Sequence, residues 1–170
     1  MPPISFSFLL SLAVLGATAV RLAPSDANLT YSPYAWLVNG STATTLNTGA
    51  NFRLLFTGNS LNITFDVTMM VSPASQLYYK VDNGPQTPFI VGPSIPVEVP
   101  VNLTQGVPYH LLTVSVKSMT ETANRWAAGV PSTRIVFTGL ELEEGAVTAP
   151  IVDSTVNILV RPGLSQADAS

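Results

Sequence analysis

A single histidine, His110, limits the chemistry that this chain can carry out. A serine hydrolase needs a base within hydrogen-bond reach of its nucleophile, and His110 is the one histidine available for that role. It stands in GVPYHLLTVSVKS, where a Gly-x-Pro turn leads into a strand-like apolar pattern. We therefore interpret His110 as a structural strand residue and predict no catalytic residue in the chain.

The carboxylates are not arranged for catalysis either. Glu141, Glu143 and Glu144 surround the end of an expected strand, where a solvated edge explains them, and a glycosidase needs two carboxylates facing each other across a cleft. The absence of cysteine excludes disulfides, thiolate metal sites and cysteine nucleophiles. Since no acidic run has the ligand density of a calcium loop, we predict no metal site and no cofactor.

Aromatic side chains are the remaining candidates for recognition. Tyr78 and Tyr79 lie on one expected strand, and Trp126 follows Arg125 in an expected loop, whereas Trp36 is expected to pack in the core. Flat rings suit sugar faces because they bury C–H surface while their polar edges stay hydrated. The sequence therefore predicts a carbohydrate site or a domain interface at Arg125, Trp126, Tyr78 and Tyr79.

The overall composition narrows the class of protein. The chain has 170 residues, a formal net charge of -3 and only 10% charged residues, where a soluble domain carries about 25%. This length allows one full domain of about 100 to 200 residues. The charge offers no broad positive field for phosphate backbones, so we predict no nucleic-acid partner. Such a composition is typical of a secreted β-rich protein.

The amino terminus reads as a targeting segment. An apolar run, ISFSFLLSLAVLG, ends in the small residues ATA, which predicts a signal peptide over residues 1–19 with cleavage between Ala19 and Val20. The alternative is a membrane anchor, because the run approaches the about 17 residues of a short spanning helix. We expect the mature protein to be secreted and extracellular, with no stable membrane span once the signal is removed.

Four Asn-x-Ser/Thr acceptors follow and are candidates for N-glycosylation in a secreted protein. The most informative lies in SLNITFDV, where apolar and polar residues alternate, so its side chain should face solvent on a half-buried strand. The four candidates are Asn28, Asn39, Asn62 and Asn102.

The elements that would position these residues are short strands. Apolar alternation recurs between Gly, Pro, Asn and Ser punctuation, and no window has the spacing of a long amphipathic helix. We predict an all-β chain, a two-sheet β-sandwich of jelly-roll type, in which the prolines between 85 and 100 suit edges and loops. The expected strands are Ala35–Val38, Asn51–Thr57, Ser60–Thr68, Gln76–Asp82, Pro96–Leu103, Tyr109–Lys117, Thr133–Glu141 and Thr155–Val160.

Four segments, taken in order, resemble a known family. They are SPYAWLVNGSTATTLNTGANFRLLFTGNSLNITFDV, LYYKVDNGP, LTQGVPYHLLTVSVKS and ETANRWAAGVPSTRIVFTGLELEEGA. Together they resemble the N-terminal β-sandwich of family 2 carbohydrate esterases and related SGNH-type hydrolases. The second is similar to a family strand ending in Val-Asp-Gly, the third to a Leu-x-x-Gly-x-His-x-Leu segment, and the fourth to an Arg-Trp loop followed by a Gly-Leu strand.

The resemblance implies an accessory domain. In that family an α/β domain follows the sandwich, removes acetyl groups from plant polysaccharides and carries its serine in a Gly-Asp-Ser block after its first strand. STVNILV at 154–160 looks like that strand, but RPGLS follows it. The expected product is the non-catalytic accessory domain of a secreted acetylesterase, truncated before the nucleophile. The expected organisation is a signal peptide at 1–19, the sandwich at 28–146, a linker and first strand of the missing domain at 147–160, and a disordered tail at 161–170.

Two alternatives remain open at this point. One is a free-standing secreted carbohydrate-binding module that uses the aromatic residues as sugar platforms. The other is a purely structural domain that packs on a catalytic partner through Arg125 and Trp126. The expected partners are accordingly a polysaccharide or the missing SGNH catalytic domain.

Overall fold

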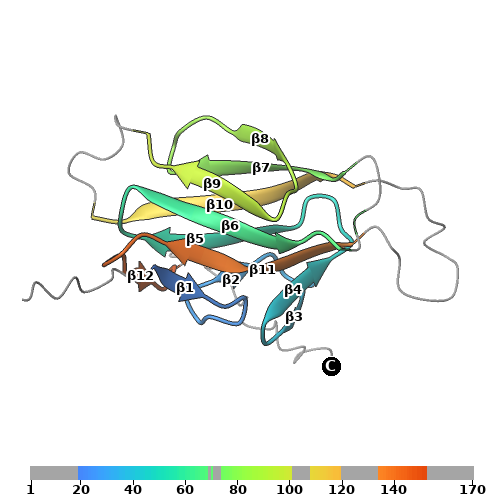
Figure 1. Cartoon of the computed structure of the whole chain (residues 1–170), viewed down its shortest axis with the longest axis horizontal. Helices are drawn as coiled ribbons and strands as arrows, with labels where there is room; N and C mark the ends of the chain where they lie inside the picture. Colours follow the sequence, from blue (N-terminus) through green and yellow to red (C-terminus); the bar gives the residue numbers. More distant parts are fainter. Residues whose placement is uncertain (1–18, 69, 71–73, 101–107, 120–133, 153–170) are drawn as a thin grey trace, which may run out of the picture.

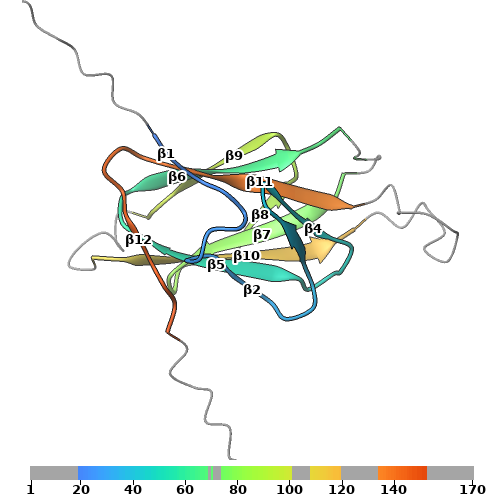
Figure 2. The same ribbon diagram turned by 90° about the horizontal axis from the view of Figure 1, so that it is seen from below.

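The computed structural model describes residues 19–68, 70, 74–100, 108–119 and 134–152. These residues form strands and no helix, and the strands pair antiparallel in two sheets that lie face to face (Figures 1 and 2). The prediction of an all-β two-sheet sandwich is confirmed. No helix in the described ranges is long and apolar enough to cross a membrane.

Sheet A has the order β3-β4-β11-β6-β9, and β1 also pairs with β11. Sheet B has the order β12-β5-β10-β7-β8, and β2 also pairs with β5. The strands of sheet A are β1 (Val20–Leu22), β3 (Leu37–Asn39), β4 (Thr42–Thr45), β6 (Ser60–Asp66), β9 (Ser94–Glu98) and β11 (Ile135–Leu142). Those of sheet B are β2 (Thr30–Tyr31), β5 (Asn51–Phe56), β7 (Gln76–Val81), β8 (Thr87–Ile90), β10 (His110–Ser118) and β12 (Thr148–Ala149).

The central strands have the topology of a jelly roll. From β4 to β11 the chain passes repeatedly between the two sheets and leaves the orders β4-β11-β6-β9 and β5-β10-β7-β8. Such a double-sheet arrangement closes a core between layers without crossover helices. The sheets in Figure 2 form the two layers of this sandwich, with β6, β9 and β11 on one side and β5, β7 and β10 on the other.

The core follows from the alternation of the strands. In β5 and β6 every second residue is buried, because successive side chains of a strand point to opposite faces. The two sheets meet at stacked rings of Phe52 and Phe137, whose centroids lie 4.4 Å apart. Phe65 packs on the edge of Phe137 at 6.0 Å, so aromatic contacts connect sheet B to two neighbouring strands of sheet A.

The expected strands near 51–57, 60–68, 76–82, 109–117 and 133–141 correspond to β5, β6, β7, β10 and β11. The strand expected at Pro96–Leu103 instead spans Ser94–Glu98, and the one expected at Ala35–Val38 spans Leu37–Asn39. Prolines 88 and 96 lie in β8 and β9, the edge strands of their sheets, where a missing N–H costs no ladder bond.

Two strands lie outside the range 28–146 that the sequence predicts for the sandwich. Strand β1 pairs with β11 through Arg21 opposite Glu141, and β12 pairs with β5 through Thr148 opposite Phe56. The predicted signal peptide, apart from its last residue, the strand expected at 155–160 and the tail at 161–170 lie outside the described residues.

One edge of β11 is shared by two strands. Strand β4 pairs with Ile135 to Phe137, and β1 pairs with Leu140 to Leu142, so neither pairs with Thr138 or Gly139 (Figure 1). The register against β6 also shifts between Phe137 and Gly139. Gly139 has φ +137°, and a Cβ there would collide with the carbonyl oxygen of Leu22. Glycine is required here because β1 approaches so closely.

Candidate functional site

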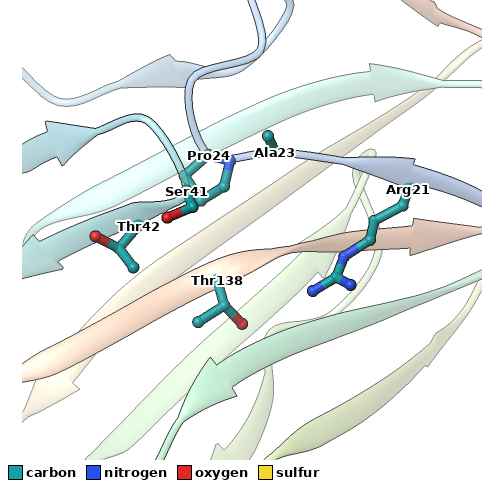
Figure 3. Close-up of a pocket in the computed structure, with 6 residues that line it drawn as sticks. All are labelled: Arg21, Ala23, Pro24, Ser41, Thr42 and Thr138. Carbon is teal, nitrogen blue, oxygen red and sulfur yellow. The ribbon is translucent and has the colours of Figure 1, made fainter.

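A groove lies on sheet A where β4 and β1 separate along β11. It is open to solvent, has a volume of about 550 Å³ and is lined by Arg21, Ala23, Pro24, Ser41, Thr42 and Thr138. Figure 3 shows the Arg21 side chain reaching from β1 over β11 toward Thr138, with Ser41 and Thr42 on the opposite side. The groove therefore brings one guanidinium and three hydroxyl groups together beside a small apolar wall, and we refer to it as the β11 groove.

The Thr138 hydroxyl at the floor of the β11 groove has a defined hydrogen-bond direction. Thr138 Oγ1 donates to Thr64 Oγ1 at 3.0 Å, and Thr64 Oγ1 donates to the Gly139 carbonyl at 2.8 Å. A hydroxyl has one hydrogen and two acceptor lone pairs. Because its hydrogen is used toward Thr64, Thr138 offers an acceptor to anything bound in the groove.

The apolar wall of the groove, formed by Ala23 and Pro24, is held in place by a residue of sheet B. The Tyr31 hydroxyl donates to the Pro24 carbonyl at 2.8 Å, and Leu22, two residues earlier, is buried in the core. Burial, together with the negative charge of Asp26, raises the pKa of Tyr31. Tyr31 thus remains a protonated donor that holds the chain beside the groove.

The predicted aromatic pair does not form one surface. Tyr79 faces the core side of β7, where its ring lies 6.1 Å from Phe89. Tyr78 points to the outer face of sheet B, where the Lys117 ammonium lies 5.0 Å from its ring centroid. Arg125 and Trp126 lie outside the described residues. Of the four predicted recognition residues, Tyr78 is therefore the one that the structure places on an outer sheet face.

His110 lies at the start of β10, and its side chain is 5% exposed. Its Nδ1 lies 2.7 Å from Asp82 Oδ2, while Asp82 Oδ1 accepts the Leu111 N–H at 2.7 Å. Asp82 has φ +49° in the turn after β7, a conformation that Asp tolerates better than most residues. The pair joins that turn to β10.

Trp36 is half-buried and donates from Nε1 to the Asn51 carbonyl at 3.0 Å. Beside it, Tyr34 is fully exposed with φ +59° and borders a second hollow of about 410 Å³. That hollow is lined by a mixture of apolar and uncharged polar side chains and has no charged side chain in its lining. Unlike the β11 groove, it offers no guanidinium to pair with an anion.

The glycosylation candidates differ in accessibility. Asn39 is exposed in β3, and Asn62 faces outward from β6 between Glu141 and Pro96. Asn28 uses its side-chain nitrogen to donate to Thr148 Oγ1 at 2.7 Å. Asn102 lies outside the described residues.

Within the described ranges, no group of three His, Asp or Glu side chains is placed to hold a metal ion. Asp66 instead accepts hydrogen bonds from the Thr68 hydroxyl at 2.7 Å and its N–H at 2.9 Å. These bonds lower the pKa of Asp66.

Solved structures share this fold. The chain resembles a family two carbohydrate esterase from Cellvibrio japonicus with a TM-score of 0.57 and 16% identity, over 81% of this chain and 37% of that one. It resembles the salicylyl-acyltransferase SsfX3 from a tetracycline biosynthetic pathway with a TM-score of 0.51 and 12% identity, over 80% of this chain and 42% of that one. No family model and no curated protein matches the chain.

These likenesses define the class of fold. The chain shares its β-sandwich with part of a carbohydrate esterase, and it spans well under half the length of either solved structure. The fold expected from the sequence resemblance is therefore the fold observed.

Proposed function

We propose that this chain provides the non-catalytic N-terminal accessory domain of a secreted, SGNH-type carbohydrate esterase. The observation that carries the proposal is the extent of the likeness. It covers 81% of this chain but 37% of the Cellvibrio japonicus esterase, the relation expected between one domain and a larger enzyme. The partner on this view is an α/β catalytic domain that acts on acetylated polysaccharide.

The contact between Asp82 and His110 supports the same relation from within the chain. Asp82 belongs to the segment similar to the family's Val-Asp-Gly strand, and His110 to the segment similar to its Gly-x-His strand. The two side chains bond at 2.7 Å although they are far apart in sequence. Two of the four resembling segments thus depend on each other for packing, which explains why they would occur together.

The environment of His110 supports an accessory rather than a catalytic role. A general base must reach the proton that it abstracts, and this imidazole is 5% exposed and bonded to Asp82. The β11 groove contains hydroxyls and a guanidinium but no carboxylate or imidazole in its lining. It therefore has groups that can bind a ligand and none that would activate a nucleophile.

The test is an acetyl-release assay on the purified secreted chain. We expect no acetate from acetylated xylan or acetylated glucomannan, and no labelling by a fluorophosphonate probe that reacts with activated serines. Release of acetate that is lost in a His110→Gln variant would make the chain a hydrolase in its own right and overturn the proposal.

The β11 groove favours a second candidate, a free-standing secreted carbohydrate-binding module. Its discriminating property is saturable binding to a polysaccharide without any catalytic partner. Affinity electrophoresis of the chain in gels containing xylan or mannan measures this directly. Retardation in such gels would support the module, and unchanged mobility in every gel would count against it.

A further inference from the structure

We propose that the β11 groove binds an acidic sugar, specifically a uronic acid residue of a glycan, with Arg21 as the carboxylate partner and Thr138 as an acceptor for a ring hydroxyl. The volume of about 550 Å³ lies within the range of ligand sites, about 300 to 1,000 Å³. Binding here would require no catalytic domain, so it goes beyond the accessory role proposed above.

The donor and acceptor pattern selects this ligand class. Arg21 supplies a planar fork of N–H donors, which matches a carboxylate in a bidentate manner. Thr138 has used its hydrogen on Thr64 and presents lone pairs, which suit a hydroxyl donor. A carboxylate and a hydroxyl on one small ring are the groups of a uronic acid, whereas a neutral sugar would form no charge-assisted pair with the guanidinium.

The rest of the groove suits a sugar ring. Ala23 offers apolar surface to C–H groups beside the buried Pro24, while Ser41 from the β3–β4 turn and Thr42 at the start of β4 add hydroxyls (Figure 3). The position of this wall is maintained by the Tyr31 bond to the Pro24 carbonyl. Strand pairing therefore holds Arg21 and Thr42, and the partly buried Tyr31 phenol holds Pro24.

Arg21 also has a carboxylate of this chain nearby. Glu141 lies opposite Arg21 in the β1–β11 ladder, although it does not line the groove. A guanidinium has five donors, so Arg21 can serve Glu141 and a ligand carboxylate together. The exposure of Arg21 and the nearby Glu141 carboxylate imply weak binding that weakens further with added salt.

The experiment is a calorimetric titration of the full chain with trigalacturonic acid, its methyl ester and xylotriose as probes. Only the free acid should bind measurably. Arg21→Gln should weaken binding about tenfold, the effect of losing one charge-assisted pair. The matched control is Lys117→Gln, which removes one positive charge from sheet B and should leave the affinity unchanged.

The outcomes separate this proposal from a general charge effect and from the esterase relation. Absence of binding, equal binding of xylotriose, or equal losses in both variants would each overturn it. An equal melting temperature of Arg21→Gln and the parent chain shows that any loss is local. Acetyl release, measured separately, bears on the accessory role and has no influence on this titration.

Discussion

Replacing Gly139 with alanine should weaken the attachment of β1 to β11. The new Cβ would collide with the Leu22 carbonyl oxygen, and φ at this position is +137°. Backbone carbonyls cannot rotate away as a flexible side chain can, so either the strain persists or β1 moves. The substitution therefore tests whether the bulge in β11 exists to admit β1.

The expected loss of stability depends on whether β1 stays in place under strain or is released from β11. Strain at a glycine-only conformation costs about 1 to 3 kcal/mol. Release of β1 instead would expose Leu22, now 4% exposed, at about 1.5 to 3 kcal/mol, and would add the loss of paired backbone groups. We expect Gly139→Ala to lower the free energy of unfolding by about 3 kcal/mol, which corresponds to a fall in Tm of roughly 6 to 12 °C.

The matched control is Gly49→Ala. Gly49 has φ +87°, but nothing lies within 4 Å of a Cβ built there. Its cost should be conformational strain alone, about 1 to 2 kcal/mol. Urea unfolding followed by circular dichroism compares the two variants. A difference of less than about 0.5 kcal/mol between them would refute the reasoning, because the collision with Leu22 would then have no measurable effect.

Three further predictions concern single side chains. Tyr31→Phe should lower the free energy of unfolding by about 1 kcal/mol at neutral pH, because the hydrogen bond to the Pro24 carbonyl is lost. Since folding raises the pKa of Tyr31, the stabilisation by its hydroxyl is complete below about pH 10 and is lost as the pH rises above that value. Parallel stability curves of variant and parent from pH 8 to 11 would contradict this account. Asp82→Ala should lower the free energy of unfolding by about 3 kcal/mol, since it removes the hydrogen bonds to His110 and the Leu111 N–H. Asp82→Asn should lower it less, because asparagine keeps an acceptor and tolerates φ +49°. Equal losses of stability for the two variants in urea unfolding would show that the side-chain hydrogen bonds matter little. Asn62→Gln, expressed in a secreting eukaryotic host, should lower the mass of the product by one glycan. It should change the free energy of unfolding by less than about 0.5 kcal/mol, because the side chain faces outward. An unchanged mass would mean that this acceptor is not used.

The fold could be predicted where alternation is strong. In β5, β6 and β10 apolar residues recur at every second position, and these strands begin and end close to the expected residues. Strand β4 has the sequence TATT, which contains no large apolar residue, yet Ala43 is fully buried. Its assignment depends on pairing with β11, which no local pattern reveals.

The β11 groove could not be predicted from local sequence. Arg21 and Thr138 lie near opposite ends of the described chain and meet because β1 pairs with the far half of β11. The opposite orientations of Tyr78 and Tyr79 could have been predicted, because neighbouring residues of a strand face opposite sides. Gly139 also carried a signal, since a glycine inside a strand indicates a bulge or a close backbone approach.

The most direct test of the accessory-domain account is the coding sequence that follows the codon for Val160, read in both the transcript and the genomic DNA. The account predicts a continuation, reached by splicing or in a shifted reading frame, that encodes a Gly-Asp-Ser block and an α/β domain after this sandwich. Genomic and transcript sequence with no such block within reach of the gene would contradict it and leave the carbohydrate-binding module as the better description.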